Sequence, residues 1–152
     1  MTALWRLTRR IHAAKQALHL GAQSSGGRWN PRGLAVVYSG TSISLVALEY
    51  FVHLSGDEPA DLVLVEIRVP DGASTGSIAS ADLPADWQEA LGLTQSKGRE
   101  WIESRRSLAL RVPSAIVPEE SNVLLDPSHA EWERVAVRVR RPLRYDLRRY
   151  KS

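Results

Sequence analysis

The chain has 152 residues, of which 43% are hydrophobic and 24% are charged, and these are ordinary proportions for a globular domain. It contains no cysteine, which excludes disulfide frameworks, thiolate zinc sites and cysteine nucleophiles. No apolar run approaches the roughly 18 residues of a membrane span, and no apolar stretch of signal-peptide type follows the basic residues near the start. We therefore expect a single soluble, cytoplasmic domain over residues 1–152.

The net charge of +3 hides an uneven distribution along the chain. Residues 1–48 carry six basic and no acidic side chains, residues 49–133 carry six basic and 16 acidic ones, and residues 134–152 carry eight basic and one acidic. This pattern fits an anion-binding surface, a nucleic-acid contact, or solvated faces that pair with one another in the fold. The charge pattern alone leaves all three open.

The first half of the chain contains two predicted strands and two predicted helices. Residues 4–7 are predicted as a short strand, and residues 11–20 as a helix that Gly21 ends. Residues 34–38 have the pattern of a second strand, after which Thr41 is the expected N-cap of a helix. That helix is apolar on nearly every side over residues 43–54, so we expect it to be largely buried.

The second half is predicted to be richer in strands. We expect strands over residues 62–69, 108–112 and 123–125, helices over 84–91 and 97–106, and a helical turn over 130–134. Residues 135–140 alternate valine with basic residues, which predicts a strand with one apolar and one basic face. Strands with helices dispersed among them indicate an α+β fold with mixed or antiparallel sheets.

Glu49 is the first acidic residue and lies inside the most apolar predicted helix. Its helical neighbours include Leu45, Val46 and Val52, so a carboxylate there is poorly solvated and must be protonated or paired. One interpretation is a buried salt bridge that fixes packing. The other is a carboxylate held in a dry cleft, where it stabilises positive charge in a transition state.

Residues 26–33, Gly-Gly-Arg-Trp-Asn-Pro-Arg-Gly, form the second candidate feature. The glycines permit tight backbone turns and close approach to a ligand, and Arg28 suits a phosphate or carboxylate. The block matches neither a dinucleotide-binding glycine motif nor a Walker loop. A structural turn with a packed Trp29 is the alternative to a binding loop.

Three further features have simpler explanations. Ser114 lies between prolines at the end of a predicted strand, where a serine often bonds its own turn. Residues 72–76 match the G-x-S-x-G elbow of hydrolases, but no helix is predicted after them, so we reject that assignment. The four histidines lack the spacing of a metal site, so no metal is expected.

The basic C-terminal segment lacks the interleaved aromatic residues on which single-stranded nucleic acids stack, so direct nucleic-acid binding is not expected.

Together these segments resemble the RES-domain family, the toxin halves of bacterial toxin–antitoxin pairs, named for an arginine, a glutamate and a serine. The matching pieces occur in the expected order over most of the chain and are Trp5-Arg6, Gly26-Gly27-Arg28-Trp29-Asn30, Tyr38, Glu49 at the end of residues 44–49, Val112-Pro113-Ser114, and residues 122–129. The arginine-tryptophan-asparagine block followed by a helical glutamate is the most specific piece. Asp126 stands where such proteins often have asparagine.

The resemblance implies a fold similar to ADP-ribosyltransferases and an activity that consumes NAD as a substrate. The family cleaves the nicotinamide–ribose bond by hydrolysis or phosphorolysis, or transfers ADP-ribose to a protein, and its usual partner is an antitoxin with an Xre-type helix-turn-helix domain. We assign catalysis to Glu49, Arg28 and Ser114, and NAD binding to Arg6, Arg28, Tyr38, Trp29 and Ser114. Ser114 is expected to hold the substrate rather than attack it, because no base lies beside it in the sequence. The alternative outside this class is a basic nucleic-acid-binding module.

Overall fold

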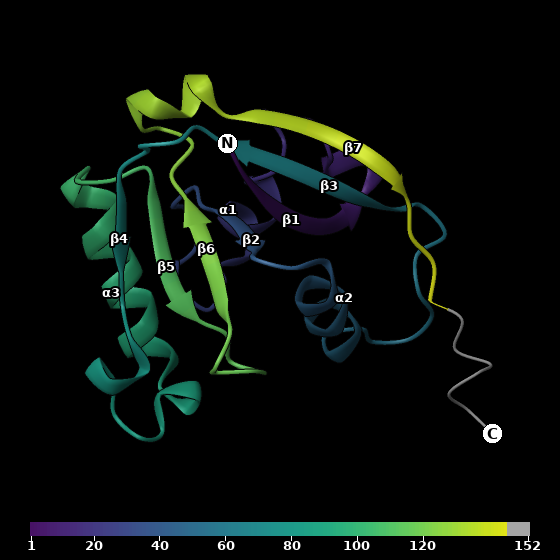
Figure 1. The fold of residues 1–152 in the computed structure, drawn as a ribbon. Helices are drawn as coiled ribbons and strands as arrows, with labels where there is room; N and C mark the ends of the chain where they lie inside the picture. The colour runs from purple at the N-terminus through teal and green to yellow at the C-terminus, as the bar shows by residue number, and fades with distance from the viewer. Residues whose placement is uncertain (146–152) are drawn as a thin grey trace.

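The computed structural model describes residues 1–145 and shows one seven-stranded sheet with three α-helices around it (Figure 1). In chain order the strands are β1 (Thr2–Arg9), β2 (Val37–Gly40), β3 (Leu62–Val69), β4 (Thr75–Ser77), β5 (Ala109–Pro113), β6 (Ser121–Leu125) and β7 (Ala136–Pro142). The helices are α1 (Leu20–Ser25), α2 (Ile43–Val52) and α3 (Leu91–Ser104), and 3-10 turns lie at Arg10–His12, Ser80–Asp82, Trp87–Glu89 and Ala130–Arg134.

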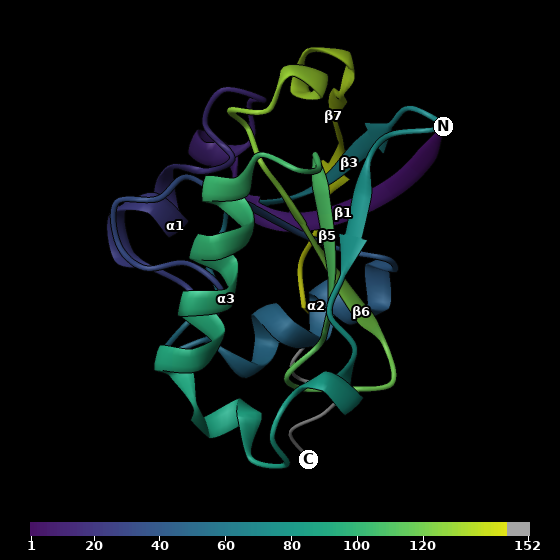
Figure 2. The same ribbon diagram turned by 90° about the vertical axis from the view of Figure 1, so that its left-hand side faces the viewer.

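The strands follow the order β4-β5-β6-β2-β1-β3-β7 across the sheet. β4 runs parallel to β5, and every other neighbouring pair is antiparallel. This mixed sheet with few helices confirms the predicted α+β class. The molecule is one domain built on a single sheet, as the ribbon views show (Figures 1 and 2).

Three apolar clusters hold the sheet in place. The largest centres on the inner strand β3, whose Val63, Val65 and Ile67 are fully buried. The second lies where α3 packs on β5 and β6 (Figure 2), and it contains the indoles of Trp29 and Trp101. The smallest joins Leu7, Val46, Leu62 and Leu143. Burying one such side chain contributes about 1.5–3 kcal/mol.

Strands β1 and β2 share only a short stretch of pairing. Their register is a single pair, Trp5 opposite Gly40, whereas β1 pairs with β3 along its whole length. The two strands therefore diverge on either side of this pair. The divergence separates the sheet into a β4-β5-β6-β2 part and a β1-β3-β7 part, with α2 beside the division (Figure 1).

The helix predicted over residues 11–20 is wrong. That segment forms a 3-10 turn and further turns, and α1 begins only at Leu20. Gly21 lies inside α1, which instead ends at Gly26 because that glycine adopts a φ of +75°. The expected N-cap is also displaced by one residue: Ser42, not Thr41, accepts a hydrogen bond from the Leu45 N–H.

The prediction that the helix over residues 43–54 is largely buried is also wrong. In α2 only Leu45 and Val46 are buried, whereas Leu48, Phe51 and Val52 are 41%, 43% and 49% exposed. A helix that is apolar on every face does not show from its sequence how many of those faces pack against other elements. Within residues 1–145, α2 contacts β1 and β2, and Tyr145 packs on it with its ring centroid 5.7 Å from that of Phe51.

Two further boundaries differ from the prediction. α3 begins at Leu91 rather than at residue 97, and residues 84–91 contain only the 3-10 turn Trp87–Glu89. The edge strand β4 was not predicted, because its Thr-Gly-Ser sequence has little strand propensity of its own. Its pairing with β5 comes from tertiary context.

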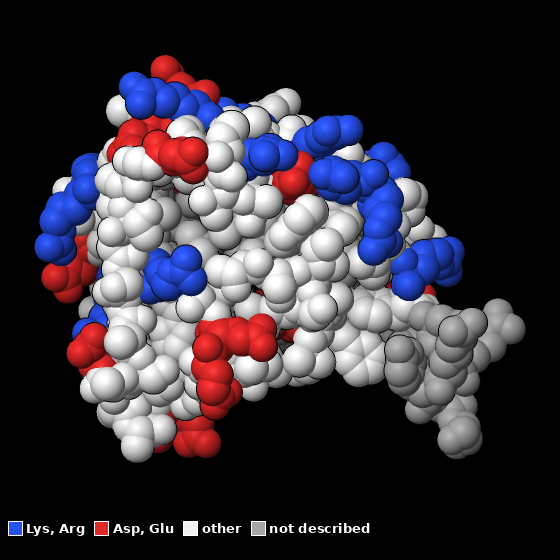
Figure 3. All heavy atoms as spheres, in the orientation of Figure 1, with Lys and Arg blue, Asp and Glu red and all other residues white. Residues whose placement is uncertain are grey.

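The basic C-terminal strand is an edge of the sheet, and Lys and Arg side chains gather along it (Figure 3). Part of this charge is paired within the fold. Glu66 of β3 is 4% exposed, and its carboxylate contacts Arg140 at 3.1 Å and Arg68 at 3.7 Å. This pairing favours the interpretation of β7 as a solvated face. Within residues 1–145, no helix is long and apolar enough to cross a membrane.

Candidate active site

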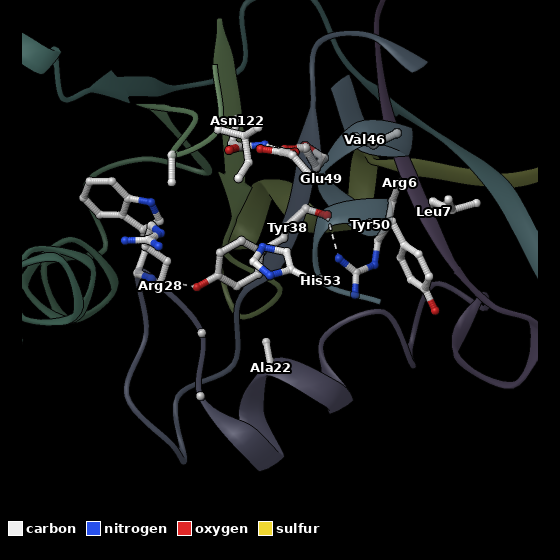
Figure 4. Close-up of a pocket in the computed structure, with 16 residues that line it drawn as sticks. Arg6, Leu7, Ala22, Arg28, Tyr38, Val46, Glu49, Tyr50, His53 and Asn122 are labelled. Atoms are coloured by element: carbon white, nitrogen blue, oxygen red, sulfur yellow. Dashed lines mark hydrogen bonds between the residues drawn. The ribbon is translucent and has the colours of Figure 1, made fainter. Parts of the chain in front are cut away.

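A cavity of about 350 Å³ lies between α2, the loop after α1 and the diverging strands β1 and β2 (Figure 4). Five of the site residues assigned from the sequence line it: Arg6 from β1, Arg28 and Trp29 from the loop, Tyr38 from β2 and Glu49 from α2. The fold thus brings together side chains that are far apart in the chain. The carboxylate and both guanidiniums face one cavity.

Both oxygens of the Glu49 carboxylate are held by uncharged donors. The Ser114 hydroxyl donates to Oε2 at 2.8 Å, and the Asn122 amide donates to Oε1 at 2.8 Å. An ionised carboxylate only accepts hydrogen bonds, so these two donors fix its orientation. No cation pairs with Glu49 anywhere in residues 1–145, which excludes the packing salt bridge as an explanation for this part of the chain.

Ser114 acts on Glu49 and not on the cavity. Its side chain is 0% exposed, and its hydroxyl oxygen accepts hydrogen bonds from the backbone N–H groups of Ile116 and Val117. Ser114 thus orients the carboxylate from behind, and the expectation that it also touches a substrate stays a prediction. The sequence placed no base beside this serine, but folding places Glu49 there.

The loop that carries Arg28 is organised around Asn30, which is 0% exposed. The Asn30 amide donates to the backbone carbonyls of Ala22, Pro31 and Leu34, and its oxygen accepts from the Tyr38 hydroxyl at 2.6 Å. Asn30 thereby closes the loop on itself and ties it to β2.

The Tyr38 hydroxyl is fully used inside the protein. It donates to Asn30 and accepts from the Trp29 N–H at 2.9 Å. Burial raises the pKa of Tyr38 to about 12, although the hydrogen bond from the Trp29 backbone opposes the shift. Tyr38 therefore stays neutral, and its ring rather than its hydroxyl is available to a ligand. A β-carbon at Gly27 would lie 2.6 Å from this hydroxyl, which explains the glycine at that position.

Helix α3 supports the same loop from the other side. Thr94 donates to the Arg28 carbonyl at 2.6 Å, and Gln95 donates to the Gly27 carbonyl at 2.8 Å. A β-carbon at Gly98 would lie 1.6 Å from the Trp29 carbonyl oxygen, so only glycine allows the helix to approach this closely.

Arg28 and Trp29 are adjacent in the loop, but their side chains make different contacts. The Arg28 guanidinium lines the cavity, donates to the Gln88 carbonyl at 2.8 Å and lies 5.9 Å from the Trp87 ring centroid. Trp29 is 2% exposed and packs in the cluster under α3, with its ring centroid 6.0 Å from that of Trp87. Trp29 also lines the cavity, so its contact with NAD stays a prediction, while its indole packs in the core and supports the loop.

Arg6 is a guanidinium held inside the protein. Its Nη1 donates to the Tyr38 carbonyl at 3.0 Å, while its Nε is buried with no partner among residues 1–145. Burial lowers the pKa of Arg6 from its usual high value, although an arginine side chain remains charged. Arg6 lines the cavity, and a guanidinium in that position is suited to an anionic ligand.

The comparisons with known proteins show the family of this chain. The model of the RES domain matches residues 3–148, which is nearly the whole chain. The chain belongs to the RES-domain family. This RES domain is 40% identical to the "Prs ADP-ribosylating toxin" of Sphingobium sp. (strain YBL2), with 97% of this chain and 96% of that protein covered. It is 36% identical to "Toxin Res" of Yersinia enterocolitica, with 86% and 87% covered.

A similar structure has also been solved. A chain in the crystal structure of the M. tuberculosis MbcT-MbcA toxin-antitoxin complex matches with a TM-score of 0.64 and 18% sequence identity. The match covers 99% of this RES domain and 87% of that chain. At this identity the similarity shows the fold.

Sequence reasoning missed three residues that line the cavity of this RES domain. Asn122 lies in a segment that was quoted for the resemblance, but it was given no role. Tyr50 and His53 follow Glu49 on α2, and the histidines had been set aside. The signal for His53 was its spacing, since residues i and i+4 share one face of a helix.

The hydrolase elbow at residues 72–76 is rejected by the structure of this RES domain. An edge strand, β4, follows Ser74 where a helix would be required. The Ser74 hydroxyl donates to Glu131, and Asp126 pairs with Arg105 at 2.9 Å. The bond between Ser74 and Glu131 ties the 130–134 turn to the start of β4, and Asp126 is paired with Arg105 instead of with a histidine.

Proposed function

We propose that this RES domain is the toxin of a toxin–antitoxin pair and that it cleaves the nicotinamide–ribose bond of NAD. The observation that carries the proposal is the Glu49 carboxylate, fixed at both oxygens in a cavity that Arg6 and Arg28 also line. The names of the relatives, "Toxin Res" and "Prs ADP-ribosylating toxin", support the same activity class.

The reaction requires an anion beside the ribose. When the C1′–N bond breaks, its electron pair moves to the ring nitrogen, so nicotinamide leaves as a neutral molecule and the ribose gains oxocarbenium character. A fixed carboxylate stabilises that developing positive charge, as in glycosidases. Because the leaving group departs neutral, no general acid is needed. Ser114 and Asn122 hold the Glu49 carboxylate in place, so it does not have to reorganise as charge develops.

The two arginines suit the other end of the substrate. NAD carries a pyrophosphate, and guanidinium groups are well matched to phosphate oxygens. The cavity, at about 350 Å³, lies near the lower end of the range for ligand pockets. It suits the nicotinamide ribose with the adjoining phosphates, and the Tyr38 ring face offers a stacking surface.

The second candidate is transfer of ADP-ribose to a protein. The name of the Sphingobium relative, 40% identical to this chain, favours it directly. The same carboxylate would serve both reactions, because only the nucleophile that attacks C1′ differs. Water gives ADP-ribose, inorganic phosphate gives ADP-ribose 1″-phosphate, and a protein side chain gives a modified protein.

The proposed partner is an antitoxin with an Xre-type helix-turn-helix domain. The similarity in fold to a chain of a toxin–antitoxin complex is consistent with a protein partner of this kind. Expression without the antitoxin should arrest bacterial growth and lower cellular NAD. Growth arrest with normal NAD levels would favour protein modification instead.

Product identification tests the proposed reaction. The protein is incubated with NAD, with and without inorganic phosphate, and the products are separated and identified by mass spectrometry. Release of nicotinamide is the expected result, and the second product distinguishes hydrolysis from phosphorolysis. Steeply salt-dependent binding to RNA or DNA without nicotinamide release would favour the nucleic-acid-binding alternative.

A further inference from the structure

A second cavity, of about 420 Å³, lies between α3 and the edge strand β4. We call it the β4–α3 groove. Residues 74–78 form one wall, and the other walls are lined by Lys97, Glu100, Trp101, Arg106, Ser107 and Leu110. It is formed by other residues than the candidate active site, and it lies at the edge of the sheet that β4 forms (Figure 1).

The floor of the groove is open because Gly76 has no side chain. Gly76 is in register with Leu110, whose side chain belongs to the cluster under α3, so both positions face the helix. A β-carbon at Gly76 would lie 3.4 Å from Leu110 and 3.6 Å from the Ser107 hydroxyl, which is ordinary contact. A side chain on a strand placed beside Gly76 would therefore enter the groove.

The backbone of β4 has donors and acceptors on its outer side. On the inner side, the Ala109 N–H donates to the Ser74 carbonyl at 3.1 Å, and the Ile78 N–H donates to the Arg111 carbonyl at 2.8 Å. In a parallel ladder the intervening residues point their N–H and C=O groups away from the neighbour. Those residues are Thr75 and Ser77, and both are exposed.

The charges in the groove favour an acidic ligand. Lys97 is half buried, and neither Lys97 nor Arg106 forms an ion pair with any acid in residues 1–145. Glu100 is the single acid among the residues that line the groove, so the lining carries a net positive charge. A half-buried ammonium gains from an anionic partner.

The two edges of the sheet differ in how they are protected against strand addition. β7 carries Arg138 and Arg141, ends at Pro142 and pairs with β3 through a register irregularity at Leu64/Val65. Charged side chains, proline, bulges and very short strands all limit pairing at an edge. β4 has no charged residue, proline or bulge, so only its three-residue length limits the addition of another strand.

We propose that the β4–α3 groove binds an extended segment of a partner protein, which adds to the sheet beside β4 and places one Asp or Glu side chain between Lys97 and Arg106. Backbone pairing aligns the segment, and the pocket selects its side chain. Because β4 has only three residues, the pairing is short and the acidic side chain supplies the specificity.

The test uses a randomised seven-residue peptide library displayed on phage and selected on the intact, immobilised protein. We expect Asp or Glu to be enriched at one position, and a peptide synthesised from that consensus to bind at least tenfold more weakly when the acid is replaced by its amide. Binding should fall to a similar degree in the Lys97→Gln/Arg106→Gln variant. Peptide binding should also be lost in Ser77→Pro, because this substitution removes an outward-facing N–H and leaves the hydrogen bonds to β5 intact.

The matched control is Arg138→Gln/Arg141→Gln, which makes the same change in charge on the opposite edge and should bind the peptide like the parent. Thermal unfolding of all the variants shows that each is folded. Selection with no preference for acids would overturn the proposal, as would unchanged binding by Lys97→Gln/Arg106→Gln. A dimer in sedimentation that Ser77→Pro dissociates would also overturn it, because the occupant would then be a second copy of this chain.

Discussion

Replacing Asn122 by alanine tests whether Glu49 must be held at both oxygens. The Asn122 amide donates to Glu49 Oε1 at 2.8 Å, while Ser114 holds the other oxygen. A hydrogen bond to a charged group contributes about 1.5–3 kcal/mol. Since about 1.4 kcal/mol corresponds to a tenfold change in rate, losing this bond in the transition state predicts a fall in kcat of about 10- to 150-fold. KM should change little, because Asn122 acts through the carboxylate.

The double variant Asn122→Ala/Ser114→Ala sharpens this test. Both side chains act on one carboxylate, so their effects should not multiply: the double variant should lose less activity than the product of the two single losses. Ser121→Ala, one residue away in β6, is the matched control, because no hydrogen bond of its side chain is present in the described structure. Independent, fully multiplicative losses would show that the two residues do not work through Glu49.

The assay follows nicotinamide release at saturating and low NAD concentrations, together with thermal unfolding of each variant. A kcat for Asn122→Ala within about twofold of the parent, in a folded protein, would refute the reasoning, because it would mean that the carboxylate needs no second anchor.

Three other predictions concern the loop that carries Arg28, helix α3 beneath it, and the hydrogen bonds between Ser74 and Glu131. Arg28→Ala should raise the KM for NAD by about tenfold or more and lower the rate, as expected for losing a charge-assisted phosphate contact, and unchanged kinetics would contradict the assignment. Gly98→Ala should lower the free energy of unfolding in denaturant by about 1–3 kcal/mol or more, because the added methyl group meets the Trp29 carbonyl of the loop. Gly92→Ala is the control on the same helix, since open space surrounds that position and its stability should not fall. Hydrogen bonds from Ser74 lower the pKa of Glu131 in the folded protein. This carboxylate therefore contributes stability that is present above its unfolded pKa and is lost as the pH falls through its folded pKa. Glu131→Gln should flatten the acid side of the plot of stability against pH, and a plot identical to that of the parent would exclude the effect.

The parts of the fold that could be predicted from the sequence are those with strong local patterns. Strand β3 was predicted with its observed bounds, 62–69, because the run is rich in strand-forming residues and its polar Glu66 and Arg68 alternate with apolar residues. β4 has no such pattern, and its short Thr-Gly-Ser stretch becomes a strand only because β5 lies beside it. The start of α3 was missed because residues 91–96 have polar and glycine positions that tertiary contacts with the Arg28 loop support.

The candidate site shows the same division. Glu49 could be identified because a carboxylate inside an apolar helix violates a local expectation and so needs a partner. The roles of its partners could not be identified, since Ser114 and Asn122 are 65 and 73 residues away from Glu49 in the chain. They come together only because β6 pairs with β5 on one side and with β2 on the other. The sequence left open whether Trp29 faces a ligand or the core, because a tryptophan in a glycine-rich loop has the same local sequence in both cases.

Glu49→Gln tests the central claim most directly, because it removes the charge while keeping the size of the side chain. Nicotinamide release from NAD by purified Glu49→Gln, measured beside the parent protein, should fall by at least about a hundredfold, the scale for losing one preorganised electrostatic group, while the variant still folds and binds NAD. Nicotinamide release at close to the parent rate would contradict the account, because the C1′–N bond would then break without the carboxylate that the fold holds in the cavity.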